Sequence, residues 1–505
     1  MGKDNKTMIQ YILKKVKKRD IKYLLYIIIF NIIILSNFIK MHFAQDTYCT
    51  ILNGFKITAE KTFLKSGRPI TAIILNIFDF LNININAFVI IMSITGIFAV
   101  SLAIYTILKT IKKFYNINTL NKMVTIGSLS FITVLNFCTL ELFVFAESGM
   151  LCISLLLSVM AACENASNSK YKYLKMCIYL SIAVLIHQAI INIYVPLSFM
   201  IIVIKNKNNI RQIFKEGIIA LIIYGGSIII NILVSKSINI FFGIAQRPTV
   251  FPTINHILVT YSKYLNVLAV NTLYIGAKYW YIILIFIITL IYFIKNITNR
   301  DKKIYLLYYC IILFSSILLP ILPVVLEEEQ SQYLELRMAI SFGASIGIMM
   351  LYTILTNKNN SVKLYKCIYI ISIIFFVINS IYIINASSEM IAANLLDRNY
   401  ANIILNKIDK YESENGIKVK KIALDYDINP EYYYSGSKHF RCLNYKSLST
   451  SWAIIGVLQT YSDRKFDEID VPENIHSNYF ANKDWDNYAD EQLIFENDTL
   501  YLCIY

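Results

Sequence analysis

Long apolar stretches alternate with short basic loops over the first three-quarters of this chain, and this alternation constrains its fold more than any other feature. Apolar runs of about 18 or more residues are typical of transmembrane helices, and Lys and Arg collect in loops on the cytoplasmic side. The composition agrees, because 56% of the 505 residues are hydrophobic and only 16% are charged. The sequence therefore predicts a polytopic membrane protein. Because the +15 net charge is concentrated beside apolar spans, it does not indicate a nucleic-acid partner.

The positions of the basic loops predict a topology. Residues 1–22 are strongly basic and are expected to stay in the cytoplasm. About eleven crossings, estimated from run length, should then leave the C-terminus outside. They are expected at 23–39, 87–108, a span ending near 143, a span returning to 170, a hairpin within 176–204, and 217–233, 281–293, 305–326, 338–355 and 367–384. A shorter segment at 70–85 contains polar residues and is expected to be interfacial or re-entrant.

The composition changes near residue 386. Residues 386–505 are polar, alternate in places such as 421–424 and 499–504, and contain turn signals. The predicted fold is therefore an all-α polytopic membrane bundle over residues 23–385, followed by a small extracytoplasmic α/β domain over residues 386–505. Cys442 and Cys503 would both lie outside, where they could form a disulfide.

Ionisable residues that lie at or within a membrane are candidates for function because burying them there is costly. A carboxylate at the surface can take a proton from a hydroxyl group, and guanidinium groups suit a bidentate grip on phosphate. Less specific interpretations stay open. Asp46 could be a helix cap, Arg68 and Arg337 could be interfacial anchors, and His187 could be a hydrogen-bonded core histidine. The candidates expected at the outer face are Asp46, Arg68, Glu141, Glu147, His187, Gln188, Arg247, Lys263, Lys278, Glu335 and Arg337.

Several short motifs among these residues resemble the type II glucosyltransferase family of O-antigen-modifying membrane proteins. They are Asp46-Thr47-Tyr48, Gly67-Arg68-Pro69 before a short apolar helix, His187-Gln188, Arg337 before a Gly-containing span, and Ser451-Trp452-Ala453. The resemblance implies a GT-C-like glycosyltransferase that moves a sugar, glucose in that family, from undecaprenyl phosphate to a cell-surface glycan. Gln45 stands before Asp46 where members often carry an acidic pair, so a divalent metal is left open and no metal ligand is assigned.

These observations together assign expected roles to five residues. Asp46 would be the catalytic base, Arg68 and Arg337 would bind the carrier phosphate, and Glu141 and Gln188 would bind sugar hydroxyls. The expected partners are a polyprenyl-phosphate sugar donor, a glycan acceptor and membrane lipids. No nucleotide-binding or hydrolase motif is present, which disfavours a nucleotide-sugar donor. A surface-polysaccharide polymerase and a polysaccharide or lipid transporter remain alternatives.

Overall fold

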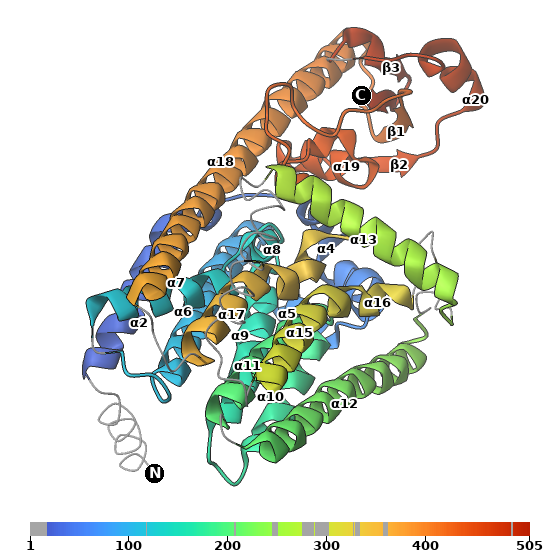
Figure 1. The fold of residues 1–505 in the computed structure, drawn as a ribbon. Helices are drawn as coiled ribbons and strands as arrows, with labels where there is room; N and C mark the ends of the chain where they lie inside the picture. The colour runs from blue at the N-terminus through green and yellow to red at the C-terminus, as the bar shows by residue number, and fades with distance from the viewer. Residues whose placement is uncertain are drawn as a thin grey trace, which may run out of the picture.

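The computed structural model describes residues 18–117, 119–206, 209–244, 251–274, 287, 302–326, 328, 334–356, 362–485 and 488–504. Over these ranges the chain forms a bundle of helices with a small sheet near the C-terminus (Figure 1). The basic residues 1–17, the candidates Arg247 and Lys278, and nearly all of the expected span at 281–293 lie outside the described residues.

The helices differ greatly in length, and several apolar segments are divided between two helices. The helices of the bundle are α2 (Lys18–Ile34), α3 (Ser36–Ile39), α4 (Gln45–Thr58), α5 (Pro69–Phe80), α6 (Ile85–Ile111), α7 (Leu120–Val134), α8 (Phe137–Leu140), α9 (Ser148–Cys163), α10 (Lys172–Ile186), α11 (Tyr194–Lys205), α12 (Ile210–Phe242), α13 (Ile254–Tyr274), α15 (Lys302–Leu318), α16 (Leu322–Val325), α17 (Ile340–Thr356) and α18 (Val362–Asn415). Short π- or 3₁₀-helical turns extend or join them at η1 (Ala59–Leu64), η2 (Glu141–Phe143), η3 (Glu164–Ala166), η4 (Ile190–Ile193), η5 (Leu319–Ile321) and η7 (Leu336–Ala339).

Five helical segments of the described chain are long and apolar enough to cross a bilayer: Ile85–Ile111, Ser148–Ala166, Ile210–Phe242, Leu336–Thr356 and Tyr365–Asn415. A sixth crossing results if the bent pair Leu120–Val134 and Phe137–Phe143 counts as one span. The prediction of a helical membrane protein is therefore confirmed. The prediction of about eleven full spans is wrong for the described residues.

The expected number of spans is too high because several apolar runs are broken into helices shorter than a bilayer needs. The expected hairpin within 176–204 does turn where predicted, but α10 and α11 contain only 15 and 12 residues. The apolar part of the first helix, Ile21–Ile34, is also short. α15 stops before Pro320, which lies in η5. A full crossing needs about 20 helical residues, and hydropathy alone does not show where a helix stops.

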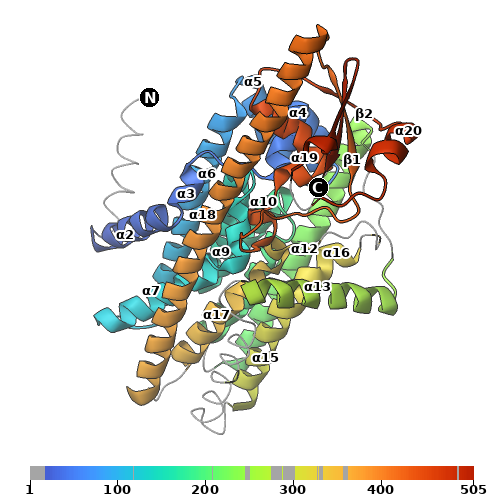
Figure 2. The same cartoon turned by 90° about the horizontal axis from the view of Figure 1, so that it is seen from above.

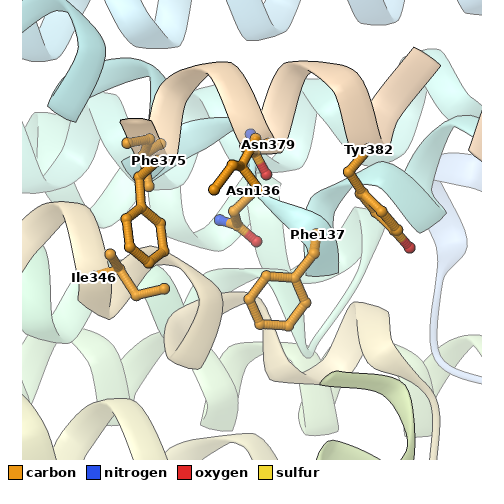
Figure 3. Close-up of a pocket in the computed structure, with 8 residues that line it drawn as sticks. Asn136, Phe137, Ile346, Phe375, Asn379 and Tyr382 are labelled. Carbon is orange, nitrogen blue, oxygen red and sulfur yellow. The ribbon is translucent and has the colours of Figure 1, made fainter. Parts of the chain in front are cut away.

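The bend between α7 and α8 shows how such a break is stabilised. The two helices meet at 52°, and the freed backbone groups need new partners inside an apolar bundle. Asn136 Oδ1 accepts hydrogen bonds from the backbone N–H groups of Cys138 and Thr139 at 3.0 and 3.3 Å. Asn379 Nδ2 on α18 donates to Leu135 O at 2.7 Å. Both amides line the small, mostly apolar pocket in Figure 3, which we therefore interpret as part of the bend.

Helix α17 packs against the same bend through two glycines. Gly343 and Gly347 have the G-x-x-x-G spacing that allows helices to approach closely in membranes. A Cβ atom at Gly343 would collide with the Asn136 side chain, and one at Gly347 would collide with Thr133 and the α7 backbone. This contact fixes the position of the N-terminal end of α17, where η7 ends.

A single 54-residue helix, α18, connects the membrane bundle to the C-terminal region. It runs along one side of the bundle and continues into that region (Figures 1 and 2). The expected boundary at residues 385 and 386 therefore lies inside a continuous helix, and not in a linker. A rigid helix fixes the C-terminal region relative to the last span.

The C-terminal region is a small mixed α/β unit, as the alternating segments predicted. Its strands are β1 (Lys421–Tyr426), β2 (Asp467–Ile469), β3 (Leu493–Glu496) and β4 (Thr499–Ile504), in the order β2-β1-β4-β3. β1 is parallel to β2 and β4, whereas β3 is antiparallel to β4. Helices α19 (Ser451–Thr460) and α20 (Glu473–Ile475) complete it. Cys442 and Cys503 are both free thiols here.

The C-terminal unit shares its core with the segment that begins α4. Phe43, just before α4, and Tyr48, in its first turns, belong to the same hydrophobic cluster as residues of α18, α19 and the sheet. A Cβ atom at Gly456 would collide with the backbone of Tyr48, so α19 and α4 touch closely. The C-terminal unit therefore holds the beginning of α4, which carries Asp46.

Candidate functional site

The most strongly fixed residue of the candidate site is Arg337, in the first turn of the Leu336–Thr356 span. Its Nη1 atom donates to Glu141 Oε1 at 2.6 Å, and its backbone N–H donates to Glu141 Oε2 at 2.7 Å. Its guanidinium group also lies 4.5 Å from the centre of the Phe145 ring. Glu141 is completely buried, whereas the Arg337 side chain remains 16% exposed. Glu141 therefore orients Arg337 and compensates its charge.

The second arginine, Arg68, is presented by a tight loop between η1 and α5. Gly67 has a φ of +71°, which favours glycine, and a Cβ atom there would lie 2.8 Å from Gln188 Nε2. Gln188 Nε2 donates to Ser66 O at 2.9 Å and to Gly67 O at 2.7 Å. Asn231 Nδ2 on α12 also donates to Gly67 O, at 2.9 Å. Gln188 and Asn231 thus fix the loop, and Pro69 begins α5 directly after Arg68.

The first turn of α4 brings a carboxylate to these arginines. The Asp46 side chain is exposed to solvent, although protein surrounds it closely enough for desolvation to raise its pKa. The charges of Arg337 and Arg68 act in the opposite direction on this pKa, and the charge of Glu141 acts in the same direction. A carboxylate with a raised pKa is a better proton acceptor at neutral pH than an ordinary surface carboxylate.

Two further ionisable residues complete the group. Glu147, in the turn before α9, is buried, and desolvation raises its pKa to about 7, with Asp46 adding to the shift and both arginines opposing it. His187, between α10 and η4, is only 3% exposed, and the charges of Arg68 and Arg337 act on it. The sequence marked both residues as candidates but did not assign them roles.

All five residues to which the sequence assigned roles therefore lie in one region, although they are far apart in the chain. The structure gives two of them contacts that differ from the expected ones. Glu141 is completely buried, and both its oxygens accept hydrogen bonds from Arg337. Gln188 uses its amide group to hold the Ser66-Gly67 backbone. These contacts make them positioning residues, which replaces our expectation that they bind sugar hydroxyls.

The structure adds one neighbour of the site that the sequence did not indicate, Cys442. Cys442, from the C-terminal unit, lies with Glu141 and Glu335 so that one potential ligand atom of each is within 4.8 Å of the others. Three such groups suggest a metal site, but Glu141 Oε1 already accepts a hydrogen bond from the cationic guanidinium group of Arg337, and Glu141 Oε2 accepts one from the backbone N–H of the same residue. A bound cation would have to compete with Arg337 at close range. These residues therefore do not fit a metal site well, and we do not assign one.

Sequence comparisons found no match between this chain and any known protein family or characterised protein. The fold and the site thus define only a class: a helical membrane protein with a polar group of two arginines, an exposed aspartate, buried glutamates and a buried histidine. The resemblance to type II glucosyltransferases stays a prediction that rests on the short motifs.

Proposed function

We propose that this protein is a GT-C-like membrane glycosyltransferase. It would move a sugar, for which glucose is our first expectation, from an undecaprenyl-phosphate carrier to a cell-surface glycan. The observation that best supports this proposal is the electrostatic proximity of exposed Asp46 to Arg68 and Arg337. Three distant parts of the chain supply these three residues, so the fold assembles one potential base next to two potential phosphate ligands.

The proposed reaction is a single displacement at the anomeric carbon of the sugar. Asp46 accepts the proton of an acceptor hydroxyl group while the oxygen of that group forms the new C–O bond. The bond between the anomeric carbon and the phosphate oxygen breaks, and the carrier phosphate leaves with the electron pair. Arg68 and Arg337 stabilise the negative charge that grows on this phosphate. The configuration at the anomeric carbon is inverted.

The proposed site faces the outside of the cytoplasmic membrane. Basic residues follow the apolar part of α6 and flank α10, and a buried ion-pair group joins Lys172 and Lys205 to Glu216 at 3.0 and 3.4 Å near these loops. Glu141, which positions Arg337, instead lies within 4.8 Å of Cys442 in the C-terminal unit. We therefore place the site and the C-terminal unit on the same, extracytoplasmic side.

A reporter fused after Tyr505 tests this orientation. An enzyme reporter that works only outside the cytoplasm should be active there, because α18 carries the chain across and continues directly into the C-terminal unit. The same reporter inserted after Lys113, in a basic loop, is the matched control and should be inactive. Activity of the Lys113 insertion together with inactivity of the Tyr505 fusion would reverse the orientation and contradict the proposed site.

The proposed activity itself predicts what accumulates when the protein is inactivated in its host. Lipid extracts should contain an excess of one undecaprenyl-phosphate sugar, measured by mass spectrometry, and the surface glycan should lose that sugar as a side group. Restoring the wild-type protein should reverse both changes. Accumulation of complete lipid-linked oligosaccharide repeats, with no single-sugar carrier, would instead identify a polymerase or a transporter.

A further inference from the structure

His187 is a buried histidine without the hydrogen bonds that normally accompany burial. Among the described residues, neither of its ring nitrogens has a hydrogen-bond partner. His42, which is equally buried, provides the contrast, because its two ring nitrogens lie 2.9 and 3.0 Å from the carbonyl oxygens of Lys40 and Phe143. Buried polar groups without partners are rare and costly. Hydrogen bonds to the backbone explain why His42 can be buried, but they do not explain the burial of His187.

The backbone on both sides of His187 is bound to the segment that presents Arg68. Ile186 O accepts a hydrogen bond from Thr71 Oγ1 on α5 at 3.3 Å. On the other side, Gln188 Nε2 donates to Ser66 O and Gly67 O. The position of His187 is therefore fixed relative to Arg68, and the charges of both Arg68 and Arg337 act on the imidazole.

The environment of His187 favours the neutral form of its ring. Burial and the two nearby guanidinium groups lower the pKa of His187, which lies outside the membrane-spanning segments. A neutral imidazole has one N–H donor and one acceptor nitrogen. It can therefore donate a hydrogen bond to an anion without adding a third positive charge.

We propose that His187 is a third phosphate-binding residue, which donates a hydrogen bond to an oxygen of the polyprenyl phosphate held by Arg68 and Arg337. This inference rests on the proposed function. Two guanidinium groups select an anion, and an unpartnered N–H group beside them completes a set of donors for several phosphate oxygens. As the bond to the sugar breaks, charge grows on the phosphate, and the hydrogen bond from His187 becomes stronger.

The test compares two probes that differ only in the phosphate group, undecaprenyl phosphate and undecaprenol, on the purified full-length protein in nanodiscs. His187→Phe keeps a flat ring but removes the donor. Its affinity for undecaprenyl phosphate should fall about tenfold, as for the loss of a hydrogen bond to a charged group. Its affinity for undecaprenol should not change. His187→Asn, which retains an N–H donor, should recover part of the phosphate affinity, and His439→Phe in the C-terminal unit is the matched control.

Two results would overturn this role of His187. One is unchanged undecaprenyl phosphate affinity in His187→Phe, and the other is an equal loss for both probes, which indicates a packing role. If His187→Phe does not fold, the same criteria apply to His187→Leu, which also lacks a hydrogen-bond donor. Arg68→Lys and Arg337→Lys separate the two proposals. If the two arginine variants lose affinity for undecaprenyl phosphate and His187→Phe does not, only the role of His187 is contradicted. If all three variants keep full affinity, the proposed phosphate site itself is contradicted.

Discussion

Replacing Asp46 with Asn should reduce sugar transfer by about 10²–10⁴-fold, the usual contribution of a general base. The substitution keeps the shape of the side chain but removes the proton acceptor. Because Asp46 is a negative charge that acts on Arg68 and Arg337, its removal should not weaken binding of an anionic donor. We therefore expect kcat to fall while the affinity for undecaprenyl-phosphate sugar stays constant or increases. A transfer assay and a separate binding assay measure the two quantities.

The control must separate catalysis from helix stability, because Asp46 lies in the first turn of α4. A carboxylate there stabilises the helix by about 0.3–1 kcal/mol, so the thermal stability of Asp46→Asn should change little. Glu60→Gln, at an exposed carboxylate in η1 directly after α4, should transfer sugar normally. Near-normal transfer by Asp46→Asn would exclude Asp46 as the base. Glu147 would then be the next candidate, because Glu141 has no access to solvent.

Residues that the sequence selected for a site come near one another in the fold, whereas the number of spans that it predicted is too high for the described residues. Positive-inside loops and the high cost of ionisable groups in a membrane select a few outer residues without any knowledge of their contacts. Asp46, Arg68 and Arg337 were found in this way, and the structure places them near one another. Spans such as α12 and Leu336–Thr356 were also predicted, because they are long and uninterrupted.

The details that the sequence could not show all depend on long-range contacts. Nothing local distinguishes Glu141 as a partner of Arg337, since 196 positions separate the two residues. The bend at Asn136 requires Asn379 on a distant helix to satisfy Leu135 O. The close packing of α19 on α4 depends on Gly456, but nothing in the local sequence shows that this glycine contacts α4. Similarly, only the fold shows that the ring nitrogens of His187 have no hydrogen-bond partner among the described residues.

The Glu141–Arg337 pair carries the largest expected effect on stability. Glu141→Gln keeps an acceptor for the backbone N–H of Arg337 but leaves the mostly buried guanidinium group without its hydrogen-bonded counter-charge. Breaking a buried ion pair by removing one partner costs about 3–5 kcal/mol. We therefore expect a clear loss of thermal stability in the purified protein, and a similar loss for Arg337→Met, which leaves the Glu141 carboxylate unpaired. If Glu141 instead bound sugar hydroxyls, Glu141→Gln would keep its stability and lose only substrate affinity.

A double variant separates charge compensation from catalysis. Glu141→Leu combined with Arg337→Met replaces the ion pair with apolar side chains, and such replacements are often neutral or stabilising. Its stability should therefore lie above that of either single variant, which is the non-additive result expected for residues in direct contact. Sugar transfer should nevertheless remain very low, because one phosphate ligand is missing. Additive losses of stability would show that the two residues act independently, and restored transfer would show that Arg337 does not bind the phosphate.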